Sequence, residues 1–421
     1  MKSHFWIRYN ENSGFSAAAI NEKTFQKEIL FMRKAFICPT KYVQGENELL
    51  NLGYFVKTFG KKALLIADPF AYNLVKDKLA ETEKKYGIEL IPCGDKFKGE
   101  CSRNVVKTLQ AFAKENKCAC TIGLGGGKAI DTSKCVAAGN PLIICPTIAA
   151  TDAPTSHSAV LYTDDHEFDD YAYFRQSPSV VLIDLNVIAN APARFLVSGM
   201  GDALSTYFEA RANVRSVSNV NAGLPCGANR AKGTLLGYGT HTAFALAELC
   251  YKNLISDGYK AKVACENHAV TQAFEKIVET NILLSGLGFE SGGLAAAHAI
   301  HDGITIIHEI HANNFHGEVV AFGTICQLIL ENAPEDELYE VLDFCDTVGL
   351  PICLQDLMTS KKDGTVARTS LTEDELKAVA VKTCIPEESI HNMPFPVTVD
   401  MVVAAIKTAD KIGREYKGYD E

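Results

Sequence analysis

Between about residues 32 and 192, short apolar runs alternate with stretches of helical composition, and this alternation is the strongest constraint on the fold. The expected strands lie at 62–68, 88–92, 120–124 and 141–146. Helical stretches at about 72–86 and 105–116 lie between them. Strands that alternate with helices indicate a parallel sheet, because parallel neighbours need a crossover connection. We therefore expect a doubly wound parallel α/β domain at 32–192.

After residue 192 the strand-like runs stop, and amphipathic or apolar helical stretches follow. They lie at about 201–214, 241–256, 261–285, 292–302, 319–331, 335–348, 373–382 and 399–415. The segment 215–238 is rich in Gly, Asn and Ser and is expected to be a loop insertion. We expect an all-α domain at 193–421. Residues 1–31 are interpreted as an extension of unknown role.

Length and composition are typical of a two-domain enzyme. A chain of 421 residues exceeds what one hydrophobic core usually organises. The net charge of −10 argues against nucleic acid or an anionic membrane surface as a partner, and no apolar run approaches the roughly 18–20 residues of a membrane span. The 14 cysteines are spread through core-like segments without a CxxC pair, which indicates reduced thiols. No cleavable signal pattern is present, and we expect a cytoplasmic protein.

A glycine-rich junction, Gly125-Gly126-Gly127-Lys128, lies where an expected strand ends and a helix begins. Glycines let the main chain approach a diphosphate closely, and the helix N-terminus adds N–H groups and a favourable dipole. Ligands of open α/β sheets bind at such strand ends. The sequence is neither GxGxxG nor a P-loop. The junction therefore leaves two interpretations open, a nucleotide-binding loop and a plain tight turn.

Histidines are concentrated in the apolar segment 291–323, which holds five of the chain's 11. Neutral imidazole is the commonest metal ligand, and His298 and His316 lie in two separate apolar elements. A buried histidine that only satisfies the core is the alternative. The HEIH sequence at 308–311 is one residue too short for the HExxH zinc motif. His298 and His301 share one helix face, so spacing does not decide which of them would bind.

Several motifs, taken together, resemble those of one family. They are GLGGGKAIDTSK, PTIAATDAP, GMGDALSTYFEAR, GFESGGLAAAHAIHDG, FHGEVVAFGT and ESIHNMP. In the same order, over roughly residues 36–421, they resemble glycerol dehydrogenases of the metal-dependent iron-containing alcohol dehydrogenase family. The resemblance implies an N-terminal NAD-binding α/β domain and a C-terminal helical domain, with the metal in the cleft between them.

The resemblance also implies a ligand set for one catalytic zinc ion per chain. Asp202 of GDAL, His298 of AHAIH and His316 of HGE match the family's ligands, which also contact the substrate. Three protein ligands leave coordination positions open, as catalytic zinc requires. Taken alone, Asp202 could instead be a helix N-cap. Asp152 matches the family's glycerol-contacting aspartate, and its alternative role is in a turn before Ala153-Pro154.

For the cofactor, the resemblance implies one group of residues at the ribose and diphosphate and another at the nicotinamide. The first group is Asp68, Gly125, Gly126, Gly127 and Lys128, and the second is Thr147, Ser156, Ser158 and Tyr162. A carboxylate at Asp68 would accept hydrogen bonds from ribose hydroxyls and repel a 2′-phosphate, which favours NAD over NADP. Ala150 departs from the family, which usually has Ser there.

The reaction implied by the resemblance is the reversible, zinc-dependent oxidation of glycerol to dihydroxyacetone by NAD⁺. The family also implies a homo-oligomer, with an octamer as the expected form. Two alternatives remain at this point. One is a dehydrogenase of another vicinal diol or of glycerol 1-phosphate, and the other is a catalytically inactive family member that acts as a binding protein. The joint presence of Asp202, His298 and His316 argues against the inactive protein.

Overall fold

The structure is a computed structural model, and it describes residues 33–165, 167–223, 237–360 and 362–419. Lys34–Glu421 form one compact unit, and all that follows concerns this unit. The extension expected at 1–31 lies outside the described residues, as does 224–236 of the expected insertion. The domain boundary between residues 192 and 193 stays a prediction.

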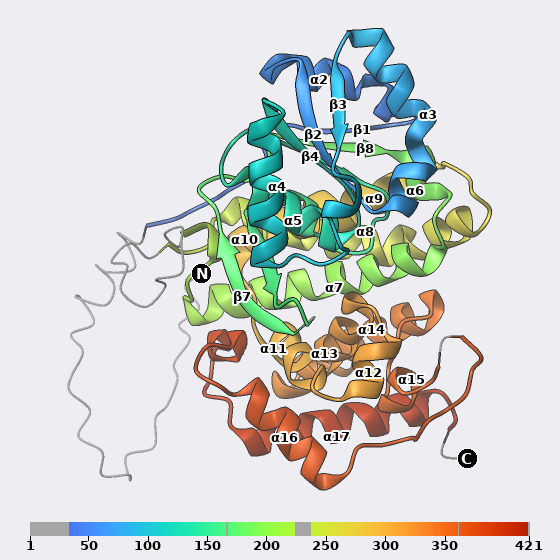
Figure 1. The fold of residues 1–421 in the computed structure, drawn as a ribbon. Helices are drawn as coiled ribbons and strands as arrows, with labels where there is room; N and C mark the ends of the chain where they lie inside the picture. The colour runs from blue at the N-terminus through green and yellow to red at the C-terminus, as the bar shows by residue number, and fades with distance from the viewer. Residues whose placement is uncertain (1–32, 166, 224–236, 361, 420–421) are drawn as a thin grey trace, which may run out of the picture. The chain divides into compact units, whose positions relative to one another are not determined.

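A six-stranded sheet organises the N-terminal part, and every neighbouring pair of its strands is parallel. The strand order is β1-β8-β5-β4-β2-β3. The strands are β1 (Tyr42–Gly45), β2 (Lys62–Ile66), β3 (Glu89–Pro92), β4 (Cys120–Gly125), β5 (Leu142–Pro146) and β8 (Val180–Asp184). The predicted doubly wound α/β fold is confirmed (Figure 1).

Successive residues of the strands enter separate hydrophobic cores on the two faces of the sheet. On one face, Leu65 and Ile122 pack with α2 (Leu52–Phe59) and α3 (Pro69–Tyr86). On the other face, Leu64 and Ile66 pack with α4 (Arg103–Glu115) and α5 (Gly127–Ala137). Ile144, Val181 and Ile183 belong to a third core, which continues into the helical part. The sheet and the helical part therefore share buried surface.

An antiparallel hairpin lies within the stretch that follows β5. It consists of β6 (Ser158–Tyr162) and β7 (Phe168–Tyr173). A short 3-10 helix, η3 (Ala153–Thr155), precedes it. Two residues expected at the nicotinamide, Ser158 and Tyr162, are thus the two ends of a strand.

The rest of the described chain is helical, and α7 crosses the middle of the view in Figure 1 with α11–α17 below it. The helices are α6 (Leu185–Ala189), α7 (Ala193–Ser216), α8 (His241–Glu266), α9 (Gln272–Glu279), a π-helical turn η6 (Thr280–Leu284), α10 (Ser285–Gly292), α11 (Ala296–Ile304), α12 (His308–Asn313), α13 (His316–Leu330), α14 (Glu335–Val348), α15 (Leu354–Leu357), α16 (Glu373–Thr383) and α17 (Val399–Tyr416).

Several helix boundaries differ from the expected ones, and α7 and α8 differ most clearly. Helix α7 begins at Ala193 rather than at 201 and continues into the expected insertion, ending at Ser216 before the left-handed Val217. Helix α8 runs through the break expected after residue 256. At this point α8 contains Gly258, which has no side chain and so lets the ring of Phe344 pack closely against the helix. An added Cβ would lie 2.7 Å from that ring.

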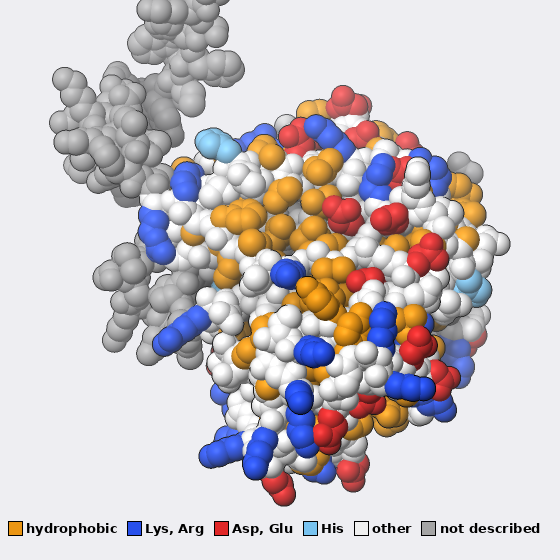
Figure 2. Space-filling model, turned by 90° about the horizontal axis from the view of Figure 1, so that it is seen from above, with side chains coloured by type: hydrophobic (Ala, Val, Ile, Leu, Met, Phe, Trp, Pro, Cys, Tyr) orange, Lys and Arg blue, Asp and Glu red, His pale blue; other side chains and the backbone are white. Residues whose placement is uncertain are grey.

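The surface is mixed in character. The face in Figure 2 shows a hydrophobic patch among side chains of both charges. Exposed large hydrophobic residues include Tyr54 on α2 and Phe70 and Leu74 on α3. None of the described helices is long and apolar enough to cross a membrane.

Candidate active site

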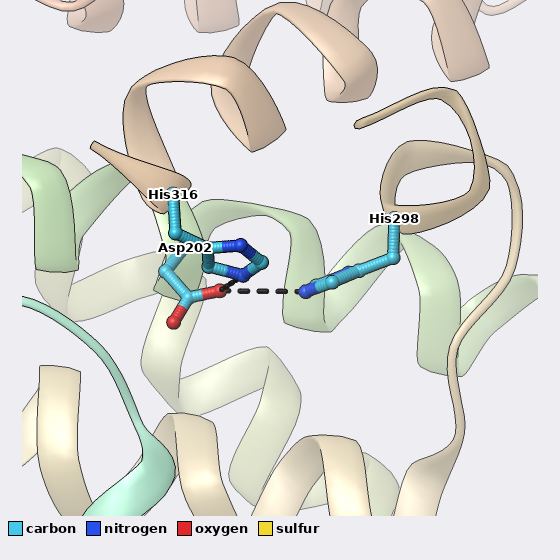
Figure 3. A group of neighbouring side chains, drawn as sticks. All are labelled: Asp202, His298 and His316. Atoms are coloured by element: carbon cyan, nitrogen blue, oxygen red, sulfur yellow. Dashed lines mark ion pairs between the residues drawn. The ribbon is translucent and has the colours of Figure 1, made fainter. Parts of the chain in front are cut away.

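Asp202, His298 and His316 meet at one point although they come from α7, α11 and α13 (Figure 3). One ligand atom from each lies within 4.8 Å of the others. Oδ1 of Asp202 is 3.4 Å from Nε2 of His298 and 3.3 Å from Nε2 of His316. Asp202 lies in the middle of α7, whose N-cap position is Pro192, so the N-cap interpretation of Asp202 is wrong. The structure brings together the three predicted metal ligands.

Glycines beside two of these ligands allow the helices that carry them to touch. A Cβ added to Gly201 would lie 2.2 Å from the carbonyl oxygen of Gly317. A Cβ added to Gly317 would lie 1.8 Å from the carbonyl oxygen of Ser198. Since real Cβ atoms do not approach so closely, only glycine fits at either position. Contact between the two main chains therefore sets the separation of Asp202 and His316.

Glu209 orients His298. It is fully buried two helical turns beyond Asp202, and its Oε2 lies 2.6 Å from Nδ1 of His298. Its Oε1 accepts the N–H groups of Ala295 (2.8 Å) and His298 (3.0 Å). A carboxylate can only accept, so Nδ1 carries the proton and Nε2 is free to bind a cation. Burial alone would lower the pKa of His298, but the charges of Glu209 and Asp202 raise it well above its ordinary value, so a cation that binds Nε2 would replace a proton there.

His301 faces His316 and lies outside the three-residue group. Its Nε2 is 3.0 Å from Nδ1 of His316, and its Nδ1 is 2.8 Å from Oδ1 of Asp302. Burial and the neighbouring His316 lower the pKa of His301 to about 4. A neutral His301 that donates to Asp302 accepts from Nδ1 of His316, which leaves Nε2 of His316 free.

The group fits a catalytic metal ion. Oδ1 of Asp202 is buried and has no hydrogen-bond partner among the described residues, and a buried carboxylate oxygen is costly without one. Burial would raise the pKa of Asp202, but His316 and His298 lower it below its usual range. One carboxylate and two imidazole nitrogens suit zinc and iron(II), and they leave coordination positions for a substrate.

Asp152 lies beside this group. Its N–H donates to Oδ2 of Asp202 (3.2 Å), and its own Oδ2 accepts from the hydroxyl of Ser285 (2.7 Å). Its side chain does not cap η3, in contrast to the turn interpretation. Burial and the charge of Asp202 raise the pKa of Asp152 well above its ordinary value. The residue expected to contact the substrate is thus linked to a predicted metal ligand.

The glycine junction and Asp68 lie at the carboxyl ends of β4 and β2. These strands are neighbours, and the chain leaves them towards opposite edges of the sheet, to β5 and to β3. Such a switch point is where open α/β sheets bind nucleotides. A Cβ added to Gly125, whose φ is +141°, would lie 3.6 Å from Oδ2 of Asp68. Gly127 faces open space at the start of α5, and Asp68 also caps α3 through the N–H of Ala71 (2.9 Å).

The other predicted cofactor residues lie on α5 or near it. The N–H of Thr147 donates to the carbonyl of Gly125 (3.1 Å), and Nζ of Lys128 lies 2.8 Å from Oε2 of Glu100. Burial, with the charges of Asp131 and Glu100, raises the pKa of Tyr162 to about 12. Tyr162 therefore stays a neutral hydroxyl at physiological pH.

Ser156 and Ser158 are held by a lysine. Nζ of the buried Lys134 donates to the hydroxyl of Ser156 and to the carbonyl of Ser158, both at 2.7 Å. Lys134 belongs to α5, so the helix that begins at the glycine junction also fixes this loop.

Sequence reasoning missed Glu209, Ser285 and Lys134. A signal existed for Glu209, since it follows Asp202 by seven residues on the same helix face and is an acid among apolar residues. Ser285 and Lys134 carried no signal, because their partners lie far away in the sequence or on the other side of a loop.

Comparisons with known proteins identify the family. Residues 39–185 match the family described as iron-containing alcohol dehydrogenase. A glycerol dehydrogenase of Escherichia coli O6:H1 is 42% identical over 385 residues, which cover 90% of this chain and 97% of that protein. A glycolaldehyde reductase of Halobacterium salinarum is 39% identical over 92% of this chain and 100% of that protein. The crystal structure of glycerol dehydrogenase from Schizosaccharomyces pombe is 36% identical, with a TM-score of 0.82 and coverage of 93% of this chain and 94% of that one.

The parallel α/β part and the mostly helical remainder are the two-part architecture of these solved relatives, and the chain is an oxidoreductase. It belongs to the iron-containing alcohol dehydrogenase family, as the motifs predicted.

Proposed function

We propose that this protein catalyses the reversible oxidation of glycerol to dihydroxyacetone, with zinc as the metal and NAD⁺ as the hydride acceptor. The observation that carries the proposal is the buried oxygen of Asp202 between Nε2 of His298 and Nε2 of His316, with Asp152 attached to the same carboxylate. Relatives named glycerol dehydrogenase over nearly the whole chain add support.

In this proposal Asp202, His298 and His316 hold the ion and define where the substrate hydroxyls bind. A bound zinc ion supplies Lewis-acid chemistry, which lowers the pKa of a coordinated hydroxyl. Asp152 accepts a hydrogen bond from a further hydroxyl of the substrate through Oδ1, since its Oδ2 is already bound by Ser285.

The cofactor would bind across the switch point of the sheet. Asp68 would accept from the ribose hydroxyls, and the main chain at Gly125, Gly126 and Gly127 with Lys128 would bind the diphosphate at the start of α5. The remaining predicted contacts, at the nicotinamide, are Thr147, Ser156, Ser158 and Tyr162. Hydride transfer is then the chemistry of the cofactor, while the protein supplies placement.

Steady-state assays with three alcohols test the reaction. If the ion binds two adjacent hydroxyls, glycerol and 1,2-propanediol are oxidised well and 1,3-propanediol poorly, because the 1,3-isomer has no secondary carbinol and forms a larger chelate ring. NADH formation is followed for each, and metal content is measured on the purified protein. Equal rates on the two propanediols would refute the chelation, and stoichiometric iron without zinc would refute the choice of metal.

Reduction of a short hydroxyaldehyde is a second candidate, favoured by the 39% identical glycolaldehyde reductase. It would use the same site in the opposite direction. Comparison of kcat/KM for glycolaldehyde with NADH and for dihydroxyacetone with NADH decides between the two, since the better substrate identifies the activity.

We also propose a cytoplasmic homo-oligomer, an octamer as the family resemblance implies. Exposed hydrophobic residues on α2 and α3 are compatible with subunit contacts. Every cysteine in the described part of the chain is a free thiol, as in reducing compartments. Light scattering of the purified protein measures the oligomeric state, and a monomer at micromolar concentration would contradict it.

A further inference from the structure

The main chain around Asp152 is held against the π-helical turn η6. The side-chain amide of Asn281 donates to the carbonyl of Ala149 (3.1 Å). The hydroxyl of Thr155 donates to the carbonyl of Ile282 (3.0 Å). Gly286 lets the helix approach, since an added Cβ would lie 1.8 Å from the Thr155 hydroxyl and 3.0 Å from the Asp152 carbonyl. Single π-helical turns are frequent at functional sites, and this one fixes the loop before and after Asp152.

With the main chain fixed, a pair of hydroxyls determines how the Asp152 carboxylate is turned. Oγ of Ser285 donates to Oδ2 of Asp152 (2.7 Å) and lies 2.9 Å from Oγ1 of Thr206. Both hydroxyl residues are buried, with exposed fractions of 0% and 1%. The single hydroxyl proton of Ser285 is used in its bond to Asp152, so in the bond with Thr206 the oxygen of Ser285 accepts and Thr206 donates. Thr206 therefore donates to Ser285, and Ser285 donates to Asp152.

The pair connects Asp152 to the helix that carries a predicted metal ligand. Thr206 follows Asp202 by one turn of α7, and Oδ2 of Asp202 accepts the N–H of Asp152. Hydrogen bonds to residues of α7 thus position both the main chain of Asp152, directly, and its carboxylate, through Ser285. Oδ1 of Asp152 is the oxygen left for a ligand.

We propose that Ser285 and Thr206 are positioning residues that set substrate preference by presenting Oδ1 of Asp152 to a hydroxyl beyond the reacting pair. This inference rests on the proposed function. Without the Ser285 hydroxyl, the carboxylate of Asp152 turns freely about its last torsion and loses preorganisation. The loss falls on glycerol, which has the further hydroxyl, and spares 1,2-propanediol, which lacks it.

The test compares kcat/KM for glycerol with kcat/KM for 1,2-propanediol in the zinc-loaded full-length enzyme. Ser285→Ala lowers the ratio about tenfold and Thr206→Val about threefold, the loss expected for one hydrogen bond. Ser133→Ala and Thr324→Val are matched controls, because these buried hydroxyls bond only within their own helices in the described residues. Their ratios stay at the wild-type value. If Ser285→Ala does not fold, as judged by circular dichroism, Ser285→Cys and Thr206→Val carry the test.

A double-mutant cycle separates positioning from a general structural role. In an Asp152→Asn background, Ser285→Ala changes the ratio less than twofold if it acts through Asp152. The same fold-change in both backgrounds, or an equal loss on both substrates, overturns the inference alone. A wild type without activity on glycerol, or an Asp152→Asn variant with the wild-type ratio, overturns the proposed function or its role for Asp152, and this inference with it.

Discussion

Glu209 decides which nitrogen of His298 is available. Its Oε1 is occupied by two main-chain N–H groups at the start of α11, so only Oε2 can face the ring. The carboxylate therefore fixes the tautomer as well as the position of the imidazole. Loss of such a partner of a metal-binding histidine typically lowers metal affinity ten- to a hundredfold.

Glu209→Gln is predicted to weaken zinc binding about ten- to a hundredfold. The amide oxygen would keep the main-chain N–H groups, so the NH₂ group would face Nδ1 of His298 and force the ring proton onto Nε2. Competition with a chelator measures the zinc affinity. Glu331→Gln is the control, since it removes a buried acid that pairs with Arg211. Wild-type affinity in Glu209→Gln would contradict the tautomer argument.

Asp68→Ser is predicted to relax the preference for NAD⁺ over NADP⁺ at least tenfold in kcat/KM. A serine at this position can still cap α3 by accepting the N–H of Ala71. It removes the charge that would repel a 2′-phosphate. The ratio of kcat/KM for the two cofactors is the measurement. A wild type that already prefers NADP⁺ would show the assignment of Asp68 to be wrong.

Among the elements, the crossing of α7 and α13 leaves no room for a side chain at Gly317. Gly317→Ala is predicted to destabilise the fold by about 3 kcal/mol and to reduce zinc content, because the new methyl would overlap the Ser198 carbonyl. Gly45→Ala is the matched control, since its nearest neighbour would be at an ordinary 3.8 Å. Denaturant unfolding and metal analysis follow the two variants. Similar stability of both would mean that the helices can separate without cost.

Helix α16 supplies a pH-dependent contribution to stability. Hydrogen bonds from Arg368 and from the Thr372 main chain lower the pKa of Glu375 to about 2. A carboxylate whose pKa is lowered by folding stabilises the fold at every pH above its pKa in the unfolded chain. This stabilisation is lost as the pH falls towards the folded pKa of about 2.

Glu375→Gln is therefore predicted to cost about 1 kcal/mol at pH 7, with the difference from wild type shrinking below pH 4. Urea unfolding of both proteins between pH 7 and pH 3 measures this. The exposed Asp374→Asn on the same turn serves as the control. A difference that stays constant down to pH 3 would exclude the charge as its source.

The elements that were predictable share a local cause. Helix α14 was expected at its observed bounds because its pattern is regular, and β4 was recognisable from an apolar run that ends in glycines. The hairpin β6–β7 was missed because β6 has apolar residues such as Val160 at its half-buried positions and no residue of β7 is buried, so neither strand alternates between polar and apolar residues in the sequence. The π-helical turn and Gly258 within α8 depend on partners distant in sequence, which no local pattern contains.

The same distinction, between features with a local signal in the sequence and features that depend on distant partners, applies to the site. The resemblance brought forward Asp202, His298 and His316 as ligands, and the structure brings them together, although their binding of zinc remains a proposal. Spacing alone could not choose between His298 and His301. The choice depends on Glu209, which is buried behind one ring, and on His316, which lies against the other.

At the scale of the whole molecule, one core joins the sheet to the helices and includes both Ile144 of β5 and Val402 of α17. The main-chain contact of α7 with α13, which places two of the predicted metal ligands, is likewise made without an ion. Removal of the ion with a chelator is therefore predicted to abolish turnover while the melting temperature falls by only a few degrees, the size expected for loss of one bound ligand. Calorimetry before and after chelation, followed by addition of zinc, checks this. Unfolding on chelation would contradict it.

The contact of Gly201 with Gly317 also fixes an order of events in the life of the protein. Helices α7 and α13 meet through their main chains, and this contact does not involve an ion. We therefore expect Asp202 and His316 to reach their positions when the core forms. Many small metal domains fold only around their metal, whereas this chain would fold first and be loaded afterwards. The identity of a bound ion would then be decided by the metals that the cell supplies to an already folded protein, and an ion would be exchangeable during the protein's lifetime without a new round of folding.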